Sequence, residues 1–126
     1  MSFANQTYDR FNPADDLTVN AVEAVQGRHF VAFTGTEERG HARVVPAAAG
    51  TFPAGVAAYD AAAGELVGLK RGNRVITVAV DAEIPAGTAV EVGAGGVAVA
   101  LDSGHPVGTV YGRGTVDGTV LVALNV

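Results

Sequence analysis

Residues 89–99 read Ala89-Val90-Glu91-Val92-Gly93-Ala94-Gly95-Gly96-Val97-Ala98-Val99. Valine recurs at every second position on both sides of the glycine-rich stretch Gly93–Gly96. This period of two is typical of β-strands, and glycine supplies the positive φ angles that hairpin turns need. No Lys-Ser/Thr pair and no helical pattern follows the glycines, so the stretch predicts a β-hairpin and not a phosphate-binding loop.

The same pattern continues in both directions from this hairpin. Short apolar segments closed by Gly, Asn or Pro are typical of strands. The predicted strands are Leu17–Ala21, Arg28–Phe33, Ala42–Val45, Gly55–Tyr59, Glu65–Leu69, Arg74–Val80, Ala89–Val92, Val97–Leu101, Val107–Tyr111 and Thr119–Leu124. Around residues 13–26, Asn12 and Pro13 could instead start a helix, but the alternation and the β-branched Thr18 and Val19 favour a strand.

The composition supports a small all-β protein. The chain has 126 residues, of which 23 are Ala, 21 Val and 17 Gly, and it has no Cys. Apolar residues make up 48% and charged residues 17%, which is typical of a globular chain. We expect a small compact β-barrel or sandwich of short strands and hairpins. Residues 1–16 form an extended N-terminal arm, and residues 17–126 form a single β-rich domain.

A weak internal repeat is visible. The segment Pro53–Tyr59 and the following Gly64–Val67 resemble Pro106–Tyr111 and the following Gly118–Val122. Each unit has a Pro-x-Gly start, a short strand, a loop and a second strand. If the repeat is structural, we expect the two hairpins to pair in one compact barrel or sandwich; the alternative is chance similarity in a sequence of low diversity.

The arm concentrates aromatic residues. Phe3, Tyr8 and Phe11 lie among polar residues with no regular period, so the arm has no core of its own. One interpretation is that these rings fold back and cap the domain. The other is that they dock on a second protein, because exposed aromatic side chains are suited to anchoring an interface.

Charge and chemistry exclude several classes of function. The net charge is −5 with no basic stripe, which argues against nucleic-acid binding. We find no secretory signal and no apolar run long enough to span a membrane. His29, His41 and His105 have no metal-ligand spacing, Ser2 and Ser103 lie in no nucleophile motif, and Glu37–His41 is most simply a solvated loop. We therefore predict no enzyme, no metal and no cofactor.

Several segments in order carry a resemblance. They are Leu17-Thr18-Val19, Val25–Val31, Gly55–Glu65, Ile84–Val92, Pro106-Val107-Gly108 and Gly118–Val122. Together they resemble the small capsid decoration (cement) proteins of tailed bacteriophages, over residues 17–126.

The resemblance implies a structural virion protein. Such proteins bind the outer surface of the phage head, usually as trimers, and stabilise contacts between major capsid protein subunits after assembly in the host bacterial cytoplasm. A homotrimer is favoured and a dimer is possible. The family has no catalytic residues to transfer, so the candidate capsid-binding residues come from the arm: Phe3, Tyr8, Phe11, Asn12 and Pro13.

Two other functions stay open. Ile84–Thr88 and Gly118–Val122 also resemble small β-clip binding modules, which would give a glycan-binding protein. A head–tail or tail component of the virion is the third possibility.

Overall fold

The structure, a computed structural model, describes residues 4–126. Within that range the chain forms ten strands and one short 3-10 turn, which confirms the predicted all-β class. The elements are β1 (Asp16–Ala21), β2 (Phe30–Glu38), β3 (His41–Pro46), β4 (Gly55–Ala57), β5 (Leu66–Lys70), β6 (Val75–Ala79), β7 (Ala89–Val92), η1 (Ala94–Gly96), β8 (Ala98–Ala100), β9 (Gly108–Val110) and β10 (Thr119–Leu124).

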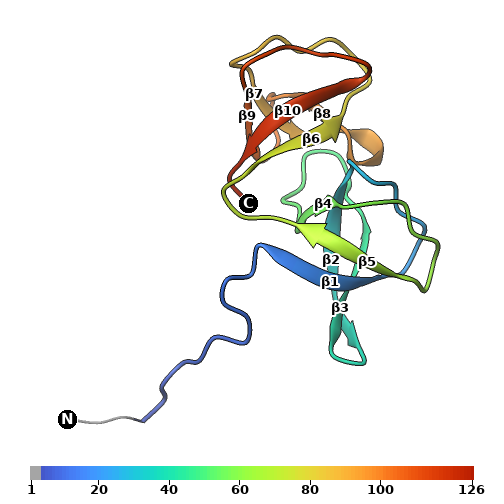
Figure 1. The fold of residues 1–126 in the computed structure, drawn as a ribbon, viewed down its shortest axis with the longest axis vertical. Helices are drawn as coiled ribbons and strands as arrows, with labels where there is room; N and C mark the ends of the chain where they lie inside the picture. The colour runs from blue at the N-terminus through green and yellow to red at the C-terminus, as the bar shows by residue number, and fades with distance from the viewer. Residues whose placement is uncertain (1–3) are drawn as a thin grey trace.

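The strands form two sheets (Figure 1). The first is a closed barrel in the order β1-β3-β2-β4-β5, and the second is an open five-stranded sheet in the order β6-β10-β9-β7-β8. All neighbouring strands are antiparallel except β1 and β3, whose parallel pairing closes the barrel. The arm leaves the barrel at β1 and runs away from the body of the molecule.

The predicted glycine hairpin is confirmed. β7 and β8 pair with Val92 opposite Ala98, and the turn between them contains η1. Gly95 and Gly96 have φ angles of 78° and 89°, a region that favours glycine. The amide of Gly93 donates to the carbonyl of Val97 at 2.7 Å and closes the turn.

The internal repeat is structural, but its predicted pairing is wrong. β4 pairs with β5 in the barrel, whereas β9 pairs with β10 in the second sheet, so the two hairpins lie in different sheets. The repeat extends beyond these hairpins, because each sheet contains the same series of neighbours: β1-β5-β4-β2-β3 in the first unit (residues 16–70) and β6-β10-β9-β7-β8 in the second unit (residues 75–124).

The register of the two units is also the same. Leu17 faces Leu69 and Val19 faces Val67 in the first unit; Ile76 faces Val122 and Val78 faces Val120 in the second. The amide of Arg28 donates to Ala57, as the amide of Gly87 donates to Val110. Arg28 and Gly87 both have positive φ angles, 65° and 84°. The chain is therefore built from two copies of one five-stranded unit.

Two hydrophobic cores correspond to the two sheets. One is made of first-unit residues alone, including Val19, Val31 and Leu69. The other belongs mainly to the second unit but contains Phe30, Ala47 and Val56 from the first. Because side chains alternate along a strand, Phe30 and Val31 point into different cores. The Phe30 ring thus packs one unit against the other.

The second strand differs from its prediction at both ends. It begins at Phe30, because Arg28 has a left-handed backbone conformation that a strand does not adopt. It continues to Glu38, so the predicted loop Glu37–His41 is wrong: Glu37 and Glu38 pair with Ala42 and His41, and only Arg39 and Gly40 form the turn. The exposed hairpin carries too few apolar residues to show a strand pattern.

Candidate binding site

The arm is the first part of the candidate site. Residues 4–15 form no strand, and Tyr8 is 83% exposed. The Tyr8 hydroxyl donates to Gln6 at 3.3 Å, and the Asn12 amide donates to Asp9 at 3.1 Å. Pro13 is exposed and follows a cis peptide bond. Phe3 lies outside the described residues. Tyr8 is thus presented to solvent.

Phe11 is placed differently from Tyr8. The guanidinium of Arg10 pairs with Glu37 on β2 at 3.1 Å, donates to the carbonyl of Gly40 at 3.5 Å, and lies 5.7 Å from the centre of the Phe11 ring. These contacts hold this part of the arm against the β2–β3 hairpin. The fold-back interpretation therefore holds for Phe11, which lies beside the barrel. Tyr8 is exposed, and its docking on a second protein stays a prediction.

A cavity of about 450 Å³ lies between Phe11 and the barrel. Its apolar lining comes from Phe11, Leu17 and Val19, together with Ala42. A neighbouring cavity of about 330 Å³ is lined by Phe11 and Phe33, with Arg10 and Glu37 at its side. Phe11 is 56% exposed and Phe33 45% exposed, so the two rings form an accessible apolar surface at this end of the barrel.

The root of the arm is firmly attached. The Asp16 carboxylate pairs with Lys70 at 2.9 Å and with Arg74 at 3.1 Å. Hydrogen bonds from Lys70 and then Arg74 lower the pKa of Asp16 below its usual value, because they stabilise the charged form. The carbonyl of Asp15 accepts from the amide of Arg71 at 2.9 Å. These contacts define the point at which the arm leaves the barrel.

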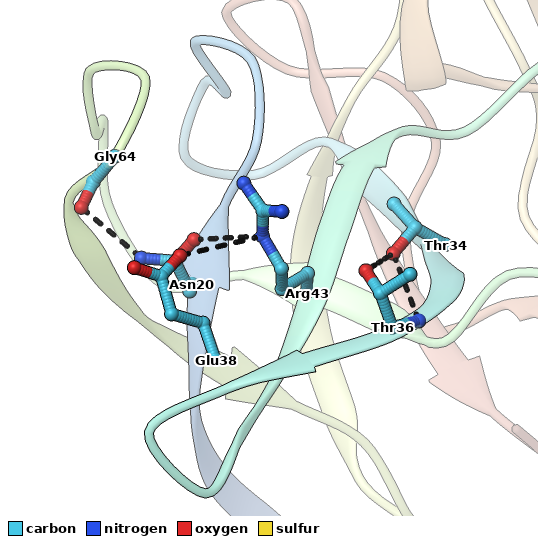
Figure 2. Close-up of polar contacts among 6 residues, drawn as sticks. All are labelled: Asn20, Thr34, Thr36, Glu38, Arg43 and Gly64. Atoms are coloured by element: carbon cyan, nitrogen blue, oxygen red, sulfur yellow. Dashed lines mark hydrogen bonds and ion pairs between the residues drawn. The ribbon is translucent and has the colours of Figure 1, made fainter.

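The β2–β3 hairpin is the second part of the site, and sequence analysis missed it. Figure 2 shows its polar contacts: Nε of Arg43 donates to the side-chain oxygen of Asn20 at 3.3 Å and pairs with Glu38 at 3.7 Å, and the hydroxyls of Thr34 and Thr36 are 2.7 Å apart. The Asn20 amide, on β1, donates to the carbonyl of Gly64 at 3.1 Å, so the residue that Arg43 contacts is itself held by the loop before β5. The cluster of charged residues Glu37–Arg39 was the feature of the sequence that could have pointed to this hairpin.

No catalytic arrangement is apparent in the described part of the chain. Between residues 4 and 126 no three His, Cys, Asp or Glu side chains gather where they could hold a metal ion. Nδ1 of each histidine lies near a backbone carbonyl: Gly27 for His29, Thr18 for His41 and Pro106 for His105. That the protein is not an enzyme stays a prediction from the sequence.

The residues described include no helix long and apolar enough to cross a membrane.

Comparison with solved structures finds a protein of similar fold. The chain is similar to the N base of the head fiber protein gp8.5 of bacteriophage phi29, with a TM-score of 0.71 and 21% sequence identity. The match covers 87% of this chain and 92% of the other. No family model matches the sequence, and no curated protein matches it. The predicted resemblance to proteins of the phage head is thus confirmed at the level of the fold.

Proposed function

We propose that this protein is a structural component of a phage virion that binds the outer surface of the head and stabilises contacts between major capsid protein subunits. The observation that carries the proposal is the fold shared with a phage head fiber base over nearly the whole chain. The arm supports it, because it presents an aromatic residue to solvent from a root that is ion-paired to the barrel.

The geometry of the arm supports attachment through its aromatic residues. Tyr8 is 83% exposed, so most of its surface is free to be buried by a partner. Burying a large apolar side chain contributes roughly 1.5–3 kcal/mol to the free energy of binding. Asn12 and Pro13 lie exposed between Tyr8 and the root, where they can contact the same partner. Phe3, with its aromatic ring, belongs to the same proposed anchor.

A homotrimer would strengthen this attachment. Three arms on one assembly bind one capsid locus with an avidity roughly 10²–10⁴ times that of one arm, provided the geometry lets them engage together. Sedimentation velocity of the purified protein measures the oligomer. A monomer at micromolar concentration would remove this part of the proposal and leave capsid binding to be tested alone.

Removal of the arm tests the function. A variant lacking residues 1–9 keeps Arg10, Asp15 and Asp16, so the contacts of the arm root are preserved. We expect it to fold as the full chain does and to lose co-sedimentation with expanded heads of the parent phage. Tyr8→Ala is the single-residue version, and Asn5→Ala is its control within the arm. Undiminished binding of the truncated chain would overturn the role of the arm.

Binding to heads also separates the alternatives. Glycan-array binding without co-sedimentation with heads would favour the β-clip module, and binding to tails alone would favour a tail component.

A further inference from the structure

The two units carry different residues at equivalent outward positions of their sheets. In the first unit, Asp16 and Lys70 lie opposite each other on β1 and β5, and their side chains form an ion pair at the surface. The equivalent pair in the second unit is Val75 and Ala123, on β6 and β10. An antiparallel sheet face that meets water is normally polar, and the terminal unit of a repeated fold needs such a face to stay soluble. The outward face of the second sheet does not follow this rule.

The apolar outward residues extend across four neighbouring strands, β6, β10, β9 and β7. The opposite pairs, in that order, are Val75–Ala123, Ala123–Thr109 and Thr109–Ala89. Residues directly opposite each other on neighbouring strands point to the same side of a sheet. We call these four residues the outward row. All of them are exposed except Ala123, which is half-buried.

One acidic residue on this side of the sheet is turned out of solvent. Glu91 of β7 is 7% exposed, and its Oε1 accepts from the amide of Asp102 at 3.1 Å. The remaining outward side chains of β6 and β10 are Thr77, Ala79, Thr119 and Leu121. Within the described chain, the outward positions of these four strands therefore present no charged side chain to solvent.

The first unit shows what covers this face where it is buried. Phe30 and Val56 are paired across β2 and β4 as Ala89 and Thr109 are paired across β7 and β9, so the two pairs are equivalent. Both Phe30 and Val56 are fully buried, and they pack in the hydrophobic core that the second unit builds. Within one chain, this face of the five-stranded unit is therefore covered by another copy of the same unit.

The charge of the molecule points to the same kind of partner. The chain has a net charge of −5, so two copies repel each other unless they meet through a surface without acidic side chains. A basic partner would need acidic side chains to hold it, and the outward row has none. An uncharged face is complementary to itself, as contact between identical subunits requires, and such contacts are depleted of charged residues at their centre. Small side chains also let two sheets stack face to face.

We propose that the outward face of the second sheet, centred on the outward row, is the contact between copies of this chain. This rests on the homo-oligomer of the proposed function and names the surface that forms it. Contact would bury Val75, now 47% exposed, together with Leu121. Tyr111 is 56% exposed, and its amide donates to the carbonyl of Leu121 at 2.7 Å, so its ring lies at the margin of the same face. Aromatic side chains at such a place anchor contacts between proteins.

The first experiment places a charge on the outward row. Thr109→Glu and Thr109→Lys change an exposed side chain, so both variants should fold, which thermal melts check. Each variant alone brings like charges together when copies meet, and we expect the dissociation constant of the oligomer to rise roughly tenfold or more in sedimentation velocity. A one-to-one mixture of the two variants should restore the oligomer, because opposite charges then meet. The matched controls are Thr36→Glu and Thr36→Lys, on exposed β2, which should assemble like the wild type.

The second experiment needs no variant. Methyl resonances of the wild-type protein are followed by NMR as its concentration is raised. We expect the methyl groups of Val75 and Leu121 to shift as copies associate. The control is Leu66, an exposed leucine on β5 of the barrel, whose methyl groups should not shift.

The outcomes separate this proposal from the proposed function, because neither experiment uses heads. If the wild type assembles and the folded Thr109 variants assemble equally well, or their mixture does not restore the oligomer, the outward face is not the contact and head binding is unaffected. A wild type that stays monomeric overturns this proposal and the homotrimer, and leaves head binding to its own test. Monomeric Thr109 variants that lose co-sedimentation with heads, while the wild type is also a monomer, would identify a head protein as the occupant and also overturn the proposal.

Discussion

At the scale of single residues, Asp16 connects the arm to the barrel. Its carboxylate is shared between Lys70 and Arg74, which lie on β5 and just before β6. Asp16 opens β1, directly after the last residues of the arm, so the ion pairs fix the point at which the arm departs. The exposed fraction of the Asp16 side chain is large, and solvent screens the pairs.

The pH dependence of stability follows from the lowered pKa of Asp16. A carboxyl group whose pKa is lower in the folded state stabilises the fold above its unfolded value, near 3.8, and loses that contribution as the pH falls through the folded value. We expect Asp16→Asn to lower the melting temperature slightly at pH 7 and to have no effect at the lowest pH. Thermal melts of both proteins across pH 2–7 check this. A difference that persists in strong acid would contradict it.

At the scale of elements, the arm and the β2–β3 hairpin form one surface from two segments far apart in sequence. Arg10 links them through Glu37 and the Gly40 carbonyl, and Phe11 and Phe33 line the same cavity. An exposed ion pair of this kind contributes only about 0–1 kcal/mol to folding. The Arg10–Glu37 pair therefore affects the position of the arm more than the stability of the fold.

Glu37→Gln tests this link. We expect the free energy of unfolding to change by less than about 0.5 kcal/mol, because the pair is exposed. The backbone order parameters of Arg10 and Phe11, measured by NMR relaxation, should fall as the arm is released from the hairpin. Glu83→Gln, on an exposed loop of the second unit, is the control. Unchanged order parameters would show that other contacts position the arm.

At the scale of the whole molecule, Phe30 joins the two units. It belongs to a barrel strand, is fully buried, and lies in the core that the second sheet builds. The amide of Ala79 on β6 also donates to the carbonyl of Arg28, at 2.8 Å, so the seam includes main-chain contact. We propose that residues 17–126 unfold as one domain for this reason.

Phe30→Ala tests that cooperativity. The substitution should destabilise the protein by about 3–5 kcal/mol, as is usual when a buried aromatic ring is removed. Urea unfolding followed by circular dichroism should show one transition, shifted as a whole. The matched control is Phe33→Ala, half-exposed on the same strand, with a much smaller expected shift. Two separate transitions would show that the units fold independently.

The sequence by itself determined the local elements. Alternating valines and the glycines of residues 93–96 define β7, β8 and their turn, because side-chain period and positive φ are properties of neighbouring residues. The aromatic residues of the arm could also be identified from the sequence, because they lie in a segment without a regular apolar period. Only the tertiary structure decided which strands pair, and so only it showed the matching strand orders of the two units, the parallel β1–β3 closure and the place of Phe30 in the other unit's core. A period of two says which residues share a face of a strand but not which strand or core that face meets.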